Sequence, residues 1–96
     1  MKTFLILFKD KQPVLFTSQL LENHVIFLQK LHDDKALIIC GPFVDNTGAV
    51  LIIKSESRQD AEKLISQDPF IQSHYYKNYS IQEFHEANEK NAWLKK

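Results

Sequence analysis

Two short segments of the chain are apolar on both alternating sets of positions. Residues 4–8 read Phe-Leu-Ile-Leu-Phe, and the strand-like segment 49–54 contains the run Val-Leu-Ile-Ile. A strand with one face in water would alternate apolar and polar residues, whereas a strand buried on both faces does not. We therefore expect both segments to be strands in the middle of a sheet.

Turn residues separate two further strands from these. Residues 36–40 read as a strand that ends at a Gly-Pro pair, and a turn cluster at 45–48 joins it to the strand at 49–54. Such a spacing is typical of a hairpin. A fourth strand lies within residues 75–84, centred on a Tyr and an Ile that alternate with polar residues.

Two segments repeat apolar residues at the period of an α-helix. The first, residues 17–33, has a seam of Leu and Phe side chains that also contains His24, and a Thr-Ser pair at its start supplies a cap. The second opens at Ser57 in a Ser-x-x-Asp sequence that resembles a capping box. It ends at Asp68, because a residue that precedes proline avoids the helical conformation.

The order of these elements predicts an α+β, ferredoxin-like βαββαβ fold for residues 1–84. With right-handed crossovers, the four strands form one antiparallel sheet with both helices on one face and the first and third strands in the centre. The uncovered face would expose an apolar patch, which soluble monomers rarely do. We therefore expect a homodimer. Residues 85–96 form a helix-prone tail, whose Trp93 we expect to dock on its own subunit or on the partner.

Composition and charge narrow the class of protein. The chain has 96 residues, which suits one domain, and is 44% hydrophobic and 25% charged, as an ordinary globular protein is. Its 12 basic and 12 acidic residues cancel, so it lacks the broad basic field that attracts nucleic acid. The longest apolar runs are too short for a signal peptide or a membrane span, and a single cysteine favours a reducing compartment. We expect a cytoplasmic protein without nucleic-acid or membrane partners.

Several short features occur in a fixed order and spacing. They are His24, Gly41-Pro42, Gly48, Ala61-Glu62 and Asp68-Pro69. Together they resemble the YciI (YCII-related) family of the dimeric α/β-barrel superfamily, over nearly the whole chain. The resemblance implies a ferredoxin-like homodimer with a His–Asp pair in a pocket, and His24 and Asp68 match that pair. A related branch includes dehydrochlorinases, and the wider superfamily includes lactone isomerases and small-molecule monooxygenases. Residues 70–74 lack a glycine that is common in the family, so we expect the pocket rim to differ.

His24 is the candidate general base. It lies four residues after Leu20 and four before Leu28, on the buried seam of its helix, where ring nitrogens need hydrogen-bond partners. It is either a core histidine with satisfied hydrogen bonds or a base, since imidazole exchanges protons near neutral pH. Asp68 is either a polar helix stop or the residue that accepts a hydrogen bond from the ring and fixes its tautomer.

Three other residues are weaker candidates. Cys40 could be a nucleophile beside His24, but a thiol in an apolar run is more often inert packing. Gly41 and Pro42 form a candidate substrate-binding segment, in which the Gly41 amide could hold an anionic oxygen. The remaining histidines lack a metal-ligand spacing, and no phosphate-binding or dinucleotide motif occurs in the sequence. We therefore expect no metal and no cofactor.

These features favour a cofactor-independent small-molecule lyase or isomerase with a His–Asp pair. The alternative is a non-catalytic domain that binds a small ligand or serves an accessory role. Both interpretations predict a cavity between the helices and the sheet. The catalytic interpretation also requires His24 and Asp68 to lie beside it, within hydrogen-bond reach or one water apart.

Overall fold

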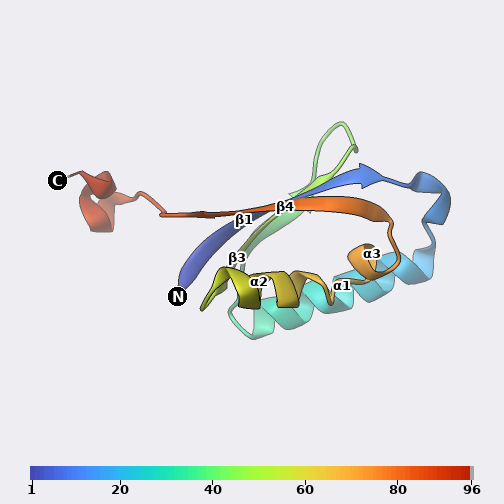
Figure 1. The fold of residues 1–96 in the computed structure, drawn as a ribbon, viewed down its shortest axis with the longest axis horizontal. Helices are drawn as coiled ribbons and strands as arrows, with labels where there is room; N and C mark the ends of the chain where they lie inside the picture. Colours follow the sequence, from blue (N-terminus) through green and yellow to red (C-terminus); the bar gives the residue numbers. More distant parts are fainter. Residues whose placement is uncertain (96) are drawn as a thin grey trace.

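Four antiparallel strands form a sheet that carries all of its α-helices on one face (Figure 1). The computed structural model describes residues 1–95. In chain order the elements are β1 (Lys2–Lys11), α1 (Ser18–Asp33), β2 (Leu37–Pro42), β3 (Ala49–Ser55), α2 (Arg58–Ile65), α3 (Pro69–Gln72) and β4 (Tyr76–Phe84). The strand order is β2-β3-β1-β4, so the two strands with two-sided apolar patterns are central. The ferredoxin-like fold is confirmed, with α3 added between α2 and β4.

The register of β1 sorts its side chains onto the two faces of the sheet. Phe4, Ile6 and Phe8 lie under the helices and are fully buried. Leu5 and Leu7 point to the opposite, open face. On β3 they pair with Ile52 and Val50, respectively, so the apolar character of the open face continues across both central strands.

Helix α1 begins where the sequence predicts a cap. The Thr17 hydroxyl accepts a hydrogen bond from the Leu20 amide at 3.0 Å, which satisfies one of the free N–H groups at the helix start. His24 and Leu31 are the buried residues of this helix. Leu21, which the periodicity places on the same seam, is instead 43% exposed.

Three predicted elements have wrong ends. Strand β1 is longer than the predicted 4–8 and continues to Lys11. Strand β2 does not stop at Cys40 but continues through Gly41 and Pro42. Proline fits there because β2 is an edge strand, where a missing N–H need not break the ladder. Helix α2 ends at Ile65, before the predicted stop at Asp68, and Asp68 instead caps the next helix, α3.

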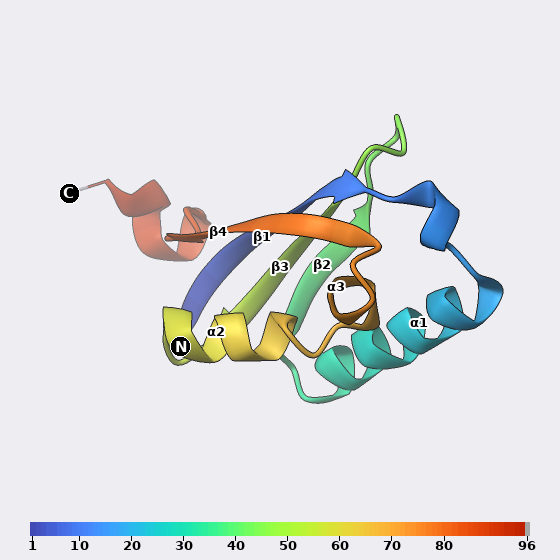
Figure 2. The same ribbon diagram turned by 45° about the vertical axis from the view of Figure 1, so that its right-hand side comes forward.

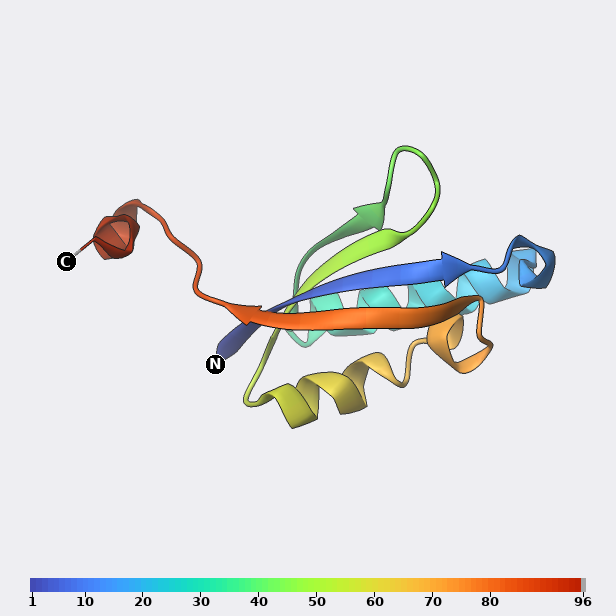
Figure 3. The ribbon, with the colours of Figure 1, turned by 45° about the horizontal axis from the view of Figure 1, so that its top comes forward.

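The segment after β4 extends away from the sheet (Figures 1 and 3). It ends in a short helical segment, Glu89–Leu94, with left-handed backbone at Ala92 and Trp93. Trp93 is 66% exposed, so the prediction that it docks on its own subunit is wrong. Docking on a partner stays a prediction.

No helix within residues 1–95 is long and apolar enough to cross a membrane. The cytoplasmic location stays a prediction.

Gly48 is required where β3 begins, because the space for a side chain is already filled. A Cβ there would collide with the Phe8 carbonyl oxygen and lie 3.1 Å from the Phe43 ring. We expect Gly48→Ala to lower the free energy of unfolding by about 2 kcal/mol, as overpacking of a dense interior does. Urea denaturation measures this effect. Gly41→Ala is the matched control, since a Cβ there meets nothing within 4 Å. Equal midpoints for the two variants would contradict the prediction.

Candidate active site

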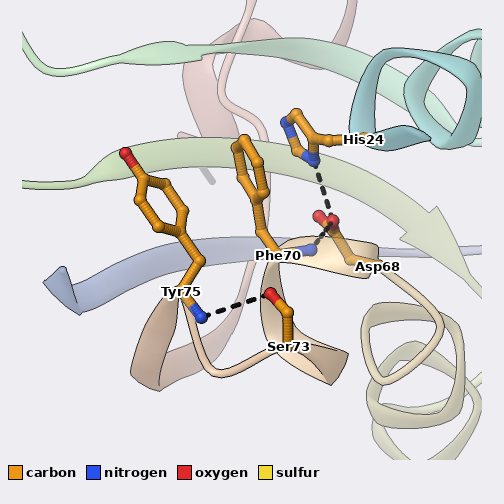
Figure 4. Close-up of polar contacts among 5 residues, drawn as sticks. All are labelled: His24, Asp68, Phe70, Ser73 and Tyr75. Atoms are coloured by element: carbon orange, nitrogen blue, oxygen red, sulfur yellow. Dashed lines mark hydrogen bonds and ion pairs between the residues drawn. The ribbon is translucent and has the colours of Figure 1, made fainter. Parts of the chain in front are cut away.

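His24 and Asp68 form a buried, hydrogen-bonded pair (Figure 4). They are 44 residues apart in sequence, but α1 packs against α3, the helix that Asp68 caps (Figure 2). His24 Nδ1 lies 2.8 Å from Asp68 Oδ1, and the Asp68 side chain is fully buried. The structure therefore brings together the two residues that the sequence singles out.

Asp68 is held by the local sequence Asp-Pro-Phe. Its Oδ1 also accepts a hydrogen bond from the Phe70 amide, at 2.9 Å, and thereby caps α3. Pro69 fits the first helical position, where its missing N–H is not needed. Because Oδ1 already acts as an acceptor toward the Phe70 amide, this network assigns the proton of the neutral imidazole to Nδ1 and leaves a lone pair on Nε2.

The second oxygen of Asp68 finds no hydrogen-bond partner in the part of the chain that the structure describes. Oδ2 is the one enclosed side-chain polar atom within residues 1–95 for which none is found. An unsatisfied buried polar atom costs about 1–3 kcal/mol, and serine would cap α3 without a second oxygen. Capping alone therefore does not explain a carboxylate at this position.

The His24 ring is also held from one side by Phe70. The two rings are stacked, with centroids 3.8 Å apart and planes 10° apart. The hydrogen bond to Asp68 fixes one edge of the imidazole and Phe70 fixes its plane, so the ring has little freedom to turn. Sequence reasoning missed Phe70; its position directly after Asp68-Pro69 was the available signal.

A cavity of about 340 Å³ lies beside the pair, between α1 and the β2–β3 half of the sheet. His24, Gly41 and Pro42 line it, together with mostly apolar side chains from α1 and β3. Among the hydrogen bonds within residues 1–95, none uses His24 Nε2, and this atom is not enclosed. Figure 4 shows this nitrogen on the side of the ring away from Asp68. The lone pair of the imidazole is therefore directed to the cavity, whose size suits a small molecule.

A second hollow, of about 450 Å³, lies near the end of β1. It is more open to solvent, and Lys11, Asn46 and Tyr75 are among the residues that line it. It contains none of the site residues that the sequence predicts. We therefore take the cavity beside His24 as the candidate site.

Cys40 lies on the wall of the same cavity as His24. Burial raises the pKa of its thiol, so it is a poorer nucleophile at neutral pH than an exposed cysteine. His32, His74 and His85 are exposed. Within the part of the chain that the structure describes, no group of three or more His, Cys, Asp or Glu side chains is placed to hold a metal ion.

Comparisons with known proteins identify the family. The sequence matches the YCII-related domain over residues 2–85. It is 33% identical over 58 residues to the uncharacterized protein YjpA of Bacillus subtilis (strain 168). The aligned region covers 60% of this chain and 68% of that protein. Among solved structures, it is similar to the 5-chloro-2-hydroxyhydroquinone dehydrochlorinase TftG of Burkholderia phenoliruptrix in complex with 2,5-dihydroxybenzoquinone. The TM-score is 0.69 at 23% identity, over 86% of this chain and 93% of that chain. Because the domain match includes both His24 and Asp68 and spans nearly the whole sequence, this chain belongs to the YCII-related family.

Proposed function

We propose that this protein is a cofactor-independent lyase or isomerase of a small ring compound, with His24 as general base and Asp68 as its orienting partner. One observation carries the proposal: the imidazole is tied through Nδ1 to a buried carboxylate, while Nε2 is directed to a mostly apolar cavity. The similarity to TftG, a dehydrochlorinase in complex with a dihydroxybenzoquinone, supports the substrate class.

The chemistry begins with proton transfer to His24. Nε2 removes a proton from a carbon or oxygen acid of the bound ring, and Asp68 stabilises the imidazolium that forms. In a lyase, the electron pair left by the proton forms a double bond, and a leaving group departs with its own pair from the neighbouring carbon. In an isomerase, the imidazolium returns the proton to a different atom. The mostly apolar lining lowers the local dielectric, which strengthens the hydrogen bond between His24 and Asp68.

A turnover screen tests this proposal. The protein is incubated in deuterated water with chlorinated hydroquinones, enolisable cyclic ketones and lactones. Proton NMR follows deuterium uptake and product formation, and an electrode follows chloride release. We expect at least one compound to undergo exchange, isomerisation or elimination. Compounds that bind the cavity without any of these changes would overturn the catalytic proposal and favour the ligand-binding domain.

We also propose that the protein is a homodimer joined through the open sheet face. Leu5 and Leu7 are only half-buried there, and so are their β3 neighbours Ile52 and Val50. Ile39, which pairs with Ile52 on β2, is 59% exposed. A contiguous apolar sheet face of this kind is rarely left in water, and a second copy of the same face would cover it.

A further inference from the structure

We propose that the Tyr76 hydroxyl is a second catalytic group of this site, which donates a hydrogen bond to the substrate oxygen that becomes negative when His24 removes a proton. The catalytic role of Tyr76 rests on the proposed function, because it requires the proton transfer to His24. The contact between Tyr76 and a ligand oxygen does not depend on turnover. Four observations support it: the reach of the side chain, its free hydroxyl, its packing and its protonation.

The Tyr76 side chain reaches the cavity from the far side of β1. Its backbone is in β4, and β1 separates β4 from β3. Neighbouring strands are about 4.8 Å apart, so the Tyr76 backbone is roughly 10 Å from the β3 wall of the cavity. Tyr76 nevertheless lines the cavity, together with Ala49 and Leu51 of that wall. Because the side chain must extend across β1, we infer that its phenol end is the part that reaches the cavity.

The hydroxyl of Tyr76 has no hydrogen-bond partner within residues 1–95. The residue is only 3% exposed, yet none of the side-chain hydrogen bonds among residues 1–95 involves this oxygen. It is not enclosed either, because among the described residues Asp68 Oδ2 is the one enclosed side-chain polar atom found without a partner. The phenol oxygen therefore meets open space, and the open space that Tyr76 lines is the cavity beside His24.

The Tyr76 ring is held in place by three aromatic neighbours. Its centroid lies 5.3 Å from that of Phe8, 5.0 Å from that of Tyr75 and 5.7 Å from that of Phe70, which meets it edge to face. Phe70 also stacks on His24, so the same ring positions both polar side chains. A donor fixed in advance loses little entropy when a ligand binds, which is the condition for effective stabilisation of a developing charge.

Tyr76 keeps its proton at neutral pH. Burial raises the pKa of the phenol, and the nearby Tyr75 and Asp68 raise it further. Tyr76 is therefore available as a hydrogen-bond donor at neutral pH. The two side chains have complementary roles, since one accepts a proton and the other donates a hydrogen bond to the resulting charge.

This pairing narrows the substrate class. The ligand needs an acidic C–H or O–H that reaches His24 and a carbonyl or phenol oxygen that reaches Tyr76. When the proton moves to Nε2, its electron pair delocalises through the ring to that oxygen, which becomes an enolate or phenolate. We expect hydroxylated or enolisable ring compounds to bind, and ring compounds without such an oxygen to bind less tightly.

A pair of ligands that differ by one oxygen tests the contact. 4-Nitrophenolate presents an anionic oxygen, whereas nitrobenzene has the same ring without it. Both are titrated against wild type and Tyr76→Phe, at a pH where the phenol is ionised. We expect the substitution to weaken 4-nitrophenolate binding about 10-fold or more, as loss of a hydrogen bond to a charged group does, and to leave nitrobenzene binding unchanged.

Tyr75→Phe is the matched control, because Tyr75 is equally buried, adjacent in sequence and absent from the cavity wall. Phe70 lies between its ring and His24 (Figure 4). Equal loss of 4-nitrophenolate affinity in both variants, an unchanged affinity in Tyr76→Phe, or no binding to wild type would overturn the inference. A selective loss in Tyr76→Phe together with a failed turnover screen would support the contact and refute the catalytic function.

Discussion

Replacing His24 with glutamine should lower turnover by about 10²- to 10⁴-fold, which is the usual contribution of a positioned general base. Glutamine is polar and of similar size, but it cannot take up a proton at neutral pH. The cavity walls and Tyr76 remain, so ligand binding should survive while kcat falls. Steady-state kinetics on the compound found in the turnover screen measure the first quantity, and direct titration measures the second.

His32→Gln is the control for this result. His32 is on the same helix and lies 3.5 Å from the carboxylate of Asp33, but both side chains are exposed. It tests whether a histidine beside an aspartate is sufficient without burial or a cavity. We expect the turnover of His32→Gln to equal that of wild type. Undiminished kcat in His24→Gln would end the catalytic proposal and leave the ligand-binding domain.

The second large effect concerns assembly: Leu7→Glu should convert a dimer into a monomer. Leu7 is in the centre of the open face, between Val50 on β3 and Ser80 on β4. In an interface its carboxylate would be buried without a partner, at a cost that weakens association by about 10²-fold or more. In the monomer the same side chain reaches water, so the fold should persist.

Sedimentation velocity at micromolar concentration measures this change, and circular dichroism confirms that the variant is folded. Gln29→Glu adds the same charge on the exposed side of α1, away from the open face, and should remain dimeric. A wild-type protein that sediments as a monomer would refute the homodimer. A dimeric Leu7→Glu variant would show that the subunits meet elsewhere.

The sheet can be predicted from the sequence because the patterns that define its strands lie within single segments of the chain. Strands β1 and β3 carry apolar residues at both alternating sets of positions, and this pattern alone places them in the centre of the sheet. The Thr17 cap and the position of His24 on the helix seam follow from spacings of three and four residues. Such features depend only on residues that are close in sequence, so they can be recognised without knowledge of the tertiary structure.

The remaining parts of the site depend on contacts that no local pattern records. Helix α3 has only four residues, too few to show a helical period, so the sequence predicts Asp68 as the end of α2 and not as a cap. The stacking of Phe70 on His24 requires α3 to meet α1. The reach of Tyr76 into the cavity requires β4 to lie beside β1, where Tyr76 pairs with Lys11, 65 residues earlier in the chain.

The protonation of the His24 ring tests the central claim most directly, and it needs no substrate. Nitrogen-15 NMR of the imidazole side chains reports which nitrogen carries the proton, and the His24→Gln spectrum identifies the His24 signals by their loss. With the ring neutral, we predict a proton on Nδ1, donated to Asp68, and a free lone pair on Nε2. A neutral His24 that carries its proton on Nε2 would contradict the account, because no base would then face the cavity.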